Sequence, residues 1–405
     1  MWQNKKVVVA VTGGIAVYKV CTLVSRLVQM GAQVRVAMTE AATSFISPET
    51  FAALSHNPVY TQMFDRVEEI PHISLAQNSD LIVVAPATAN ILAKAALGIA
   101  DDLVSAILVA ASAPIVMVPS MNSVMWGNPA VQANLSVLVQ RGVTIVQPES
   151  GVLACGTSGA GRYPELDEIM AQIQAVLSPQ VLAGRKVLVT AGPTREYLDP
   201  VRFLSNPSTG LMGLELAKAA WQHGAEVTLV HGPISLAIPS YLRAIQVISA
   251  LDMEQAVLKA LPEHDVLLMT AAVADYRPVQ EADCKLKKRT TNLESLALTR
   301  NPDILKEVQK IRRPDQIILG FAAETAPDLK ALGQLKLEEK GLDFIVANRV
   351  FKSETGFGQE TQTKVLVQNR AGLEIEFTEV SKADLAGQLC RLIAEYKAGE
   401  NVADR

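Results

Sequence analysis

Short apolar segments recur along the first half of the chain and alternate with segments of helical periodicity. KKVVVAVTG reads as a strand that ends at a glycine turn, and QVRVAMT as a second strand. DLIVVAPAT and PIVMVPSM follow, and each is apolar on both faces, as strands buried in a parallel sheet are. Apolar positions from Ile15 to Met30 recur with helical spacing. This alternation predicts an α/β domain with a mainly parallel sheet.

The second half shows the same alternation with different residues. RKVLVTAGPT, AEVTLVHGP, DVLLMTAAVAD, QIILGFAAET and DFIVAN are predicted strands, with helical stretches between them. TKVLVQN and GLEIEFTEV predict an added hairpin, and a final helix is expected over 382–397. VLSPQVLAGR, at 176–185, has the composition of a helix end and a linker. We therefore predict two α/β domains, at 1–183 and 184–405.

Two stretches imitate membrane signals but are too short or too interrupted to cross a bilayer. Lys5 and Lys6 precede an apolar run, but glycines interrupt that run and no cleavage site follows it. Residues 103–140 carry no charge, yet prolines and asparagines divide them into short pieces. We expect a helix, a buried strand, a loop and a second helix there, and no membrane segment.

Composition narrows the possible partners and the compartment. A net charge of −4 over 405 residues gives no electrostatic basis for binding nucleic acid or an anionic membrane. The cysteines, Cys21, Cys155, Cys284 and Cys390, are far apart and form no CxxC pair, so neither a zinc site nor a disulfide framework is expected. This use of cysteine fits the reducing cytoplasm.

Polar residues follow each predicted strand of the first half, at 12–16, Thr39, 86–90 and 119–122. The carboxyl ends of parallel strands share one edge of the sheet, so these residues are expected to meet in one crevice. Neither GxGxxG after a strand nor GxxxxGK[ST] occurs, so phosphates would be held in another way, for example by amides at helix starts. The turn Thr12-Gly13-Gly14 is one such place, although an ordinary strand–helix connection reads the same.

Three residues of the first half are candidates for chemistry, and each has a structural alternative. His72 lies just before the third strand, where a lone histidine is more often structural. Asn122 follows the fourth strand and can recognise a carboxylate or cap the next helix. Cys155 lies in GVLACGTSGAGR, which we predict to be a mobile flap and neither helix nor strand. Its thiol is either a proton donor or a small buried side chain, and the glycines argue against burial.

The second half offers cations and amides suited to polyphosphate. The polar loop TREYLDPVRFLSNPSTG carries Asn206, Ser208, Thr209 and Gly210 before a predicted helix, and CKLKKR places four cations within five residues. NPDIL, with Asn301 before Pro302, predicts a helix start, and Lys336 and Lys340 would share one helix face. Lysines bind phosphate oxygens as point charges, so these groups indicate a polyphosphate site; solvated surface lysines are the alternative.

Short motifs cover nearly the whole chain. In the first half they are TGGIAVYK, PHISLA, APATAN, ILAKAALGIADDL, PSMNSVMW and ACGTSGAGR. In the second half they are TAGPTREYLDPVRFLSNPSTG, AAVADYR, KLKK, NPDIL, GFAAET and KGLDFIVAN. In this order they resemble the bifunctional phosphopantothenoylcysteine decarboxylase / phosphopantothenate–cysteine ligase family of coenzyme A biosynthesis. The resemblance implies a flavin-containing cysteine decarboxylase fold followed by a ligase domain, both Rossmann-like and three-layered.

For the first half, the resemblance implies a decarboxylase that binds FMN and leaves 4′-phosphopantetheine. FMN would oxidise the thiol-bearing carbon and so create the electron sink that decarboxylation needs. By the same resemblance Cys155 returns a proton from the flap, His72 is the catalytic histidine and Asn122 grips the substrate carboxylate. The positions that match flavin contacts, some of which come from a neighbouring subunit in this family, are Gly13, Gly14, Thr39, Thr88 and Asn90.

For the second half, the resemblance implies a ligase that uses CTP and Mg²⁺ to join 4′-phosphopantothenate to cysteine through an acyl-cytidylate. Asn206 matches the residue that binds this intermediate, and Lys285 matches the lysine that contacts the triphosphate. The other matched CTP positions are Asp275, Pro302, Asp303, Ile304, Leu305, Phe321, Lys336 and Lys340. No metal ligand is assigned. Pro207, and Leu211 in a usual lysine position, depart from the family pattern and leave the local phosphate contacts open.

Two other functions are open for the first half. One is a flavoprotein with another chemistry, such as a flavin prenyltransferase, and the other is a regulator that keeps FMN without turnover. The joint presence of His72, Asn122 and Cys155 argues against the regulator. The resemblance also implies a large homo-oligomer, with decarboxylase trimers and ligase dimers, whose partners are the small-molecule substrates 4′-phosphopantothenate, cysteine and CTP.

Overall fold

The chain forms two compact units, Met1–Leu177 and Ser178–Arg405. The computed structural model describes residues 2–64, 70–153, 156–287, 295–324, 328–349 and 361–396. The predicted boundary at residue 183 falls a few residues beyond this division, within the segment expected to be a linker. No helix in the described ranges is both long and apolar enough to span a membrane.

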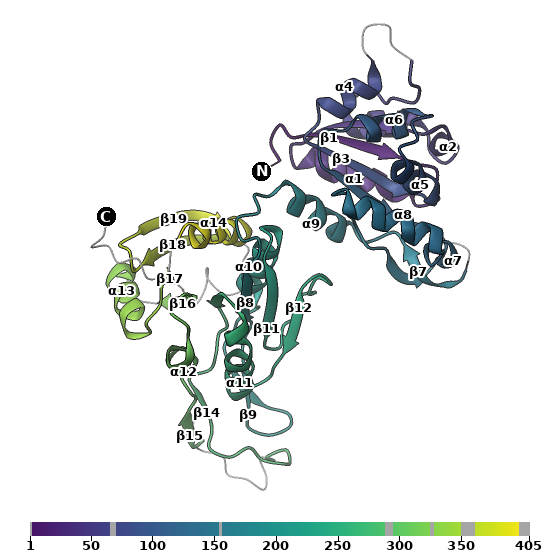
Figure 1. Cartoon of the computed structure of the whole chain (residues 1–405). Coiled ribbons are helices and arrows are strands. Elements are labelled where there is room, and N and C mark those ends of the chain that lie inside the picture. The colour runs from purple at the N-terminus through teal and green to yellow at the C-terminus, as the bar shows by residue number, and fades with distance from the viewer. Residues whose placement is uncertain are drawn as a thin grey trace. The chain divides into compact units, whose positions relative to one another are not determined.

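A five-stranded parallel sheet forms the centre of the first unit, in the order β2-β1-β3-β4-β5. Figure 1 labels two neighbouring strands of this sheet, β1 and β3. Its strands are β1 (Lys6–Val11), β2 (Gln33–Met38), β3 (Leu81–Ala87), β4 (Ile115–Pro119) and β5 (Thr144–Ile145). The parallel α/β character predicted from the sequence is therefore confirmed. The two-residue β5 has no strand pattern of its own and was not predicted.

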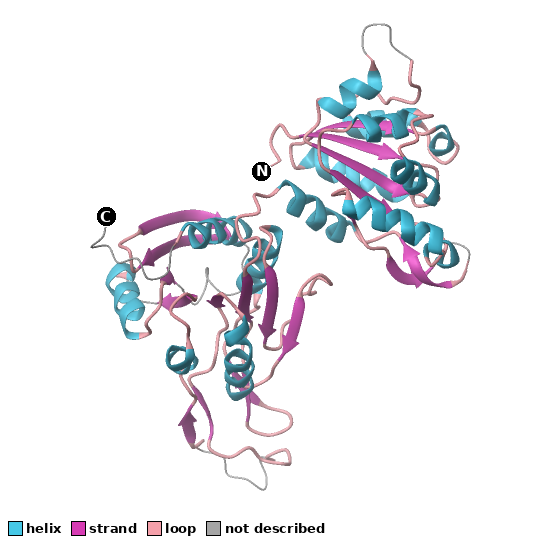
Figure 2. Ribbon diagram, in the orientation of Figure 1, coloured by secondary structure: helices cyan, strands magenta, loops and turns pink. Residues whose placement is uncertain are grey.

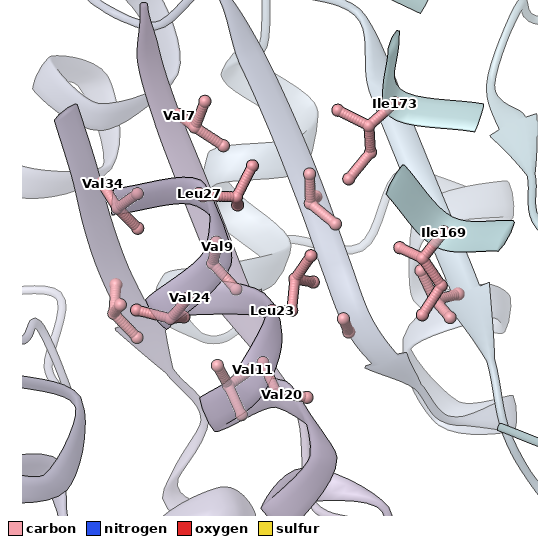
Figure 3. Packing of buried hydrophobic residues seen from close by; sticks show 14 of the residues in the cluster. Val7, Val9, Val11, Val20, Leu23, Val24, Leu27, Val34, Ile169 and Ile173 are labelled. Carbon is pink, nitrogen blue, oxygen red and sulfur yellow. The ribbon is translucent and has the colours of Figure 1, made fainter. Parts of the chain in front are cut away.

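Helices cover both faces of this sheet. They are α1 (Val17–Gln29), α2 (Glu40–Thr43), α3 (Pro48–Ser55), α4 (Pro71–Gln77), α5 (Ala89–Leu97), α6 (Leu103–Ala110), α7 (Ser123–Trp126), α8 (Pro129–Gln140) and α9 (Leu166–Leu177). Figure 3 shows Leu23 and Leu27 of α1 beside Val7 and Val9 of β1, while Ile169 and Ile173 of α9 join the same cluster farther along the sheet. The opposite face packs against α5, α6 and α8, which completes a three-layer core. The uncharged stretch at 103–140 forms the expected helix, strand and helix, with α7 as one turn in the loop.

The prediction that the glycine-rich segment around residue 155 forms no strand is wrong. Its two arms are β6 (Glu149–Val152) and β7 (Ser158–Arg162), which pair as an antiparallel hairpin. Two of its glycines serve close packing instead of loop flexibility. A Cβ at Gly161, where φ is +128°, would lie 2.2 Å from the Met121 carbonyl oxygen, and one at Gly159 would lie 2.8 Å from Ser123 Cβ.

An eight-stranded sheet forms the centre of the second unit, in the order β12-β11-β8-β13-β16-β17-β18-β19. The strands are β8 (Lys186–Ala191), β11 (Glu226–His231), β12 (Arg243–Gln246), β13 (Val266–Met269), β16 (Ile317–Glu324), β17 (Phe344–Arg349), β18 (Thr361–Asn369) and β19 (Glu374–Ser381). The first six in spatial order are parallel, and β18 and β19 continue the sheet as the predicted antiparallel hairpin. Figure 2 shows this sheet with helices on both sides.

The helices of the second unit are α10 (Leu211–Gln222), α11 (Ala250–Ala260), the short η1 (Leu261–Glu263), α12 (Ile304–Ile311), α13 (Leu329–Glu339) and α14 (Lys382–Glu395). Clusters on the two sheet faces place α10 and α14 on one side and α11, α12 and α13 on the other. The predicted helix start in NPDIL lies later than expected. Asp303 is the N-cap and its carboxylate accepts from Lys306 N, so Pro302 stands outside the first turn.

Two small ribbons of the second unit are not predicted from the sequence. The predicted polar loop after β8 contains the hairpin of β9 (Arg195–Tyr197) and β10 (Phe203–Ser205). The second ribbon pairs β14 (Tyr276–Pro278) with β15 (Leu298–Arg300). Three-residue strands are too short to show a periodic pattern, which explains why sequence reasoning missed them.

Candidate functional sites

The strand order of the first unit puts a topological switch point between β1 and β3. The chain leaves these two adjacent strands toward opposite sides of the sheet, and α/β sheets bind ligands at such a point, beyond the carboxyl ends of the strands. Thr12, directly after β1, links the ends of the two strands: its hydroxyl donates to the Pro86 carbonyl at 2.5 Å and accepts from Thr88 N at 3.3 Å. The predicted meeting of polar strand ends is thus visible between residues 12 and 88.

The predicted flavin positions follow the carboxyl ends of β1, β2 and β3. Thr39 and Thr88 are the N-caps of α2 and α5, and their hydroxyls accept from Ala42 N and Ile91 N. Asn90 is exposed in the first turn of α5. Gly13 has no room for a side chain, because a Cβ would lie 2.6 Å from Ala41 Cβ. A Cβ at Gly14 would lie 3.6 Å from Pro86 Cγ and 3.8 Å from Thr88 Cγ2, which are ordinary contact distances.

The three residues proposed for chemistry in the first unit have different surroundings. His72 is the second residue of α4, and its buried Nδ1 has no hydrogen-bond partner among the described residues. Asn122 caps α7, with Oδ1 accepting from Val124 N at 2.8 Å, so the capping alternative is real and occupies one of its polar atoms. Cys155 lies outside the described residues. The roles of all three stay predictions.

The β6–β7 hairpin, which carries the segment of Cys155 between its arms, docks on the segment of Asn122. Met121 N donates to the Gly161 carbonyl at 3.0 Å, and α7 packs against β7. The close approach needs the two side-chain-free positions Gly159 and Gly161. A displacement of the hairpin is therefore transmitted to the neighbour of Asn122.

The motif ILAKAALGIADDL has a structural explanation. Lys94 of α5 forms ion pairs with Asp101 at 2.6 Å and with Asp102 at 2.7 Å. Hydrogen bonds to Asp101 and Asp102 raise the pKa of Lys94, and Asp102 also caps α6 through Ser105 N. This motif joins two helices that cover the sheet and contributes no candidate chemistry.

A cavity of about 760 Å³ opens at the carboxyl edge of the second sheet. The order of β11, β8 and β13 creates a second switch point there, between β8 and β13. Thr190 of β8 accepts from Thr270 N and Ala271 N, each at 3.1 Å. The cavity is lined by Asn206 and by eight of the nine predicted CTP positions: Asp275, Pro302, Asp303, Ile304, Leu305, Phe321, Lys336 and Lys340.

Side-chain amides hold the backbone that forms the floor of this cavity. Asn206 Nδ2 donates to the carbonyls of Ala272 and Val273, both at 3.2 Å. Asn301 Nδ2 donates to Ala274 O at 2.8 Å, and its backbone N donates to Asp275 O at 2.8 Å. Because both hydrogens of the Asn206 amide are used, its Oδ1 is the atom that can face a ligand.

Cations and carboxylates alternate around the cavity. Lys336 pairs with Glu324 at 2.6 Å, and Lys340, the C-cap of α13, pairs with Asp303. Arg300, Lys306 and Lys382 also line it, and sequence reasoning had not selected them. Lys306 pairs with Asp303, three residues earlier, whereas α14 brings Lys382 to the cavity from a distant part of the sequence. No group of three His, Cys, Asp or Glu side chains suited to a metal occurs among the described residues.

Lys285 is the predicted CTP residue that the structure does not bring to the cavity lining. It is exposed and lies beside Leu286, whose backbone is fixed by an ion pair. Asp199, fully buried, accepts from Leu286 N at 3.1 Å and binds Arg202 at 2.6 Å, and Arg202 donates to Leu286 O at 2.9 Å. The hydrogen bond from Arg202 holds the pKa of Asp199 well below its usual range. The rest of the basic segment, 288–289, lies outside the described residues.

Comparison with known families divides the chain in the same way as its structure. The family described as Flavoprotein matches residues 1–178. The family described as DNA/pantothenate metabolism flavoprotein C-terminal domain matches residues 182–396.

The chain is similar to relatives that cover nearly all of its length and to solved structures that each cover about half of it. The Coenzyme A biosynthesis bifunctional protein CoaBC of Bacillus subtilis (strain 168) is 46% identical over 400 residues, covering 97% of this chain and 98% of that protein. The protein of the same name from Mycobacterium bovis is 42% identical over 409 residues, covering 98% and 97%. A C-terminal domain of CoaBC is 37% identical with a TM-score of 0.45, covering 53% of this chain and 96% of that one. A PPC decarboxylase mutant complexed with pantothenoylaminoethenethiol is 27% identical with a TM-score of 0.40, covering 42% and 97%.

Proposed function

The chain belongs to the family of coenzyme A biosynthesis bifunctional proteins, and we propose on this premise that each unit carries one of its two reactions. The protein ligates 4′-phosphopantothenate to cysteine and decarboxylates the product to 4′-phosphopantetheine. The match of residues 1–178 to the Flavoprotein family supports the first unit as the decarboxylase. The cavity of the second unit, which gathers Asn206 and eight predicted nucleotide positions, supports that unit as the ligase and is the observation that carries the assignment.

The residues at the carboxyl ends of β1, β2 and β3 fit a flavin mononucleotide. Gly13 packs closely against Ala41, and a methyl group at Gly14 would fill the space toward Pro86 and Thr88. Thr39, Thr88 and Asn90 add polar atoms around the same edge. FMN, when bound, supplies reversible oxidation of the thiol-bearing carbon, which gives the decarboxylation its electron sink.

The side chains of the first unit would then position the substrate and move protons. The buried Nδ1 of His72, which lacks a described partner, is a polar atom suited to face a substrate. Asn122 Nδ2 would donate to the carboxylate, since Oδ1 is committed to the helix cap. Cys155, on the segment between β6 and β7, would close over the product and donate the final proton from its thiol.

The cavity of the second unit would hold CTP and the substrate carboxylate. The carboxylate attacks the α-phosphorus of CTP and displaces pyrophosphate; the cysteine amine then attacks the acyl carbon and displaces CMP. Lys336 and Lys340 would neutralise the developing phosphoryl charge, and Asn206 Oδ1 would face the acyl-cytidylate. Mg²⁺ fits as an ion brought with the triphosphate, because Asp275 and Asp303 offer the one or two carboxylates such an ion uses. Lys285 would reach the triphosphate from its exposed segment.

The remaining proposals concern the cellular compartment and the oligomeric state of the protein. Cys21, Cys284 and Cys390 are free thiols in the described ranges, which supports a reducing compartment, and we place the protein in the cytoplasm. We also propose a homo-oligomer of decarboxylase trimers and ligase dimers, which size-exclusion chromatography with light scattering measures directly.

Turnover of the three substrates tests whether the chain carries out both reactions. The purified full chain, expected to be yellow, is mixed with 4′-phosphopantothenate, cysteine, CTP and Mg²⁺, and the product mass is measured. One pyrophosphate and one CO₂ should be released for each 4′-phosphopantetheine formed. Pyrophosphate without CO₂ would refute the decarboxylase assignment of the first unit, and CO₂ only from supplied phosphopantothenoylcysteine would refute the ligase assignment of the second. A prenylated flavin or no turnover at all would instead favour the other two functions.

A further inference from the structure

Lys382 is a buried cation in the wall of the second unit's cavity. Its side chain is only 4% exposed, whereas lysines are almost always exposed. It is also the first residue of α14, where the helix dipole disfavours a positive charge. Burial lowers the pKa of its ammonium group. The position is therefore unfavourable for a cation in two ways, and a nearby anion would offset both.

The cavity reaches both faces of the sheet, and Lys382 lies on the face away from the predicted nucleotide helices. Ile304 of α12 and Leu337 of α13 belong to the core cluster of one face. Leu385, one turn beyond Lys382 on α14, belongs to the cluster of the other face, with Val346 and Val365. All of these except Leu337 line the cavity together with Lys382. On the α14 side of the cavity, Lys382 is therefore surrounded in the wall by apolar side chains.

Cations on both sides of the cavity already interact with other groups of the chain. Lys336 and Lys340 each form an ion pair with a carboxylate, Glu324 and Asp303. Lys382 also keeps an interaction within the chain, but an ammonium group has three donors, so further bonds to an anion are possible. Ligation brings two phosphorylated molecules into one site, and each needs a cation or amide donors.

We propose that Lys382 binds a phosphoryl group of one of the two phosphorylated ligation substrates, CTP or 4′-phosphopantothenate, on the α14 side of the cavity. This inference rests on the assignment of the cavity to the ligase reaction. The low exposure of the site strengthens the interaction, because a charged hydrogen bond is worth more where water is excluded.

Steady-state ligation by the full chain with the variant Lys382→Met tests the proposal. Methionine keeps the length of the buried side chain and removes the charge. The KM of one phosphorylated substrate should rise about tenfold to a hundredfold, as loss of a charged hydrogen bond predicts, while the KM of cysteine stays the same. A rise for CTP alone identifies the triphosphate as the bound group, and a rise for 4′-phosphopantothenate alone identifies its phosphate. Lys382→Arg should recover part of the loss.

Thermal unfolding supplies a readout that a purely structural lysine would not change in the same way. CTP and 4′-phosphopantothenate, each added alone, should raise the melting temperature of the wild type, and one of these increments should shrink in Lys382→Met. Lys330→Met is the matched control, because Lys330 is 70% exposed on α13, pairs with Glu374 and lies off the cavity. Unchanged KM values and unchanged increments for both ligands, with or without a lower melting temperature, would overturn the proposal.

Asn206→Ala separates failure of this inference from failure of the proposed function. If Asn206→Ala abolishes ligation while Lys382→Met leaves both KM values unchanged, the ligase assignment stands and the role of Lys382 is wrong. If neither variant affects ligation, the cavity is not the ligase site, and both proposals fail together.

Discussion

Replacement of Gly161 by alanine should impair decarboxylation without touching the proposed chemical groups. Gly161 lies in β7, where the hairpin that carries the Cys155 segment docks on Met121, the residue before Asn122. An added methyl group would approach the Met121 carbonyl oxygen to 2.2 Å. We expect the hairpin and the Asn122 segment to separate, because neither the carbonyl nor the strand can keep its present position.

Two contributions set the size of the effect. The φ of +128° at Gly161 is a conformation that alanine adopts at a cost of about 1–2 kcal/mol. The clash requires a displacement of roughly 1 Å, and a misplacement of this size in a catalytic site costs about a hundredfold in rate. We therefore expect kcat/KM for decarboxylation to fall about a hundredfold, with only a modest fall in the stability of the first unit.

The assay supplies phosphopantothenoylcysteine to the full chain and follows CO₂, while pyrophosphate release reports ligation in the same preparation. Gly142→Ala is the matched control, since Gly142 has φ +83° and no atom within 4 Å of the added methyl group. Gly159→Ala adds a clash with Ser123 without a positive φ and should give an intermediate effect. If Gly161→Ala and Gly142→Ala decarboxylate equally well, contact between the hairpin and the Asn122 segment does not matter for catalysis.

The other predictions concern single side chains. Cys155→Ser should still release CO₂ but accumulate the unreduced product by mass spectrometry; normal 4′-phosphopantetheine would refute its role as proton donor. His72→Asn should block CO₂ release while pyrophosphate release continues, and wild-type decarboxylation would reject the catalytic assignment. Lys285→Gln should cripple CTP-driven ligation and spare decarboxylation; an equal loss of both would mean a general folding defect. Arg202 lowers the pKa of Asp199 in the folded state. The ionised carboxylate therefore stabilises the fold fully above pH 3.8, the ordinary pKa of aspartate, and this stabilisation is lost as the pH falls below that value. Asp199→Asn should therefore melt at a lower temperature than wild type at pH 7, with the difference shrinking toward pH 3.

The strands could be predicted from the sequence because each central strand is a short apolar run buried on both faces. The same reasoning failed where tertiary contacts determine the structure. The glycines of the β6–β7 hairpin look like loop residues, yet Gly161 is required by the backbone of Met121, which lies 40 positions earlier in the sequence. The helix start at NPDIL was displaced because the Asp303 carboxylate, not the proline, provides the cap.

The residues of the candidate sites likewise include some that the sequence identifies and some that only the fold reveals. Motif positions such as Phe321 and Lys336 lie around the cavity, although no periodicity in the sequence brings them together. The sequence identifies Lys382 only as the start of a final helix, because its burial depends on how α14 packs against α10 and the sheet. Lys285 is a candidate because it matches a lysine of the resembled family, and sequence alone could not reveal that Asp199 and Arg202 hold the backbone next to it.

The junction between the two units is short and continuous. α9 ends at Leu177, and the core of the second unit already includes Leu182. Every round of translation therefore makes the two catalysts in equal numbers, so a cell cannot produce one without the other. Tethering also gives a released intermediate an effective local concentration of acceptor sites that does not fall when the protein is dilute. Flux through the two steps would then scale together with expression of a single polypeptide.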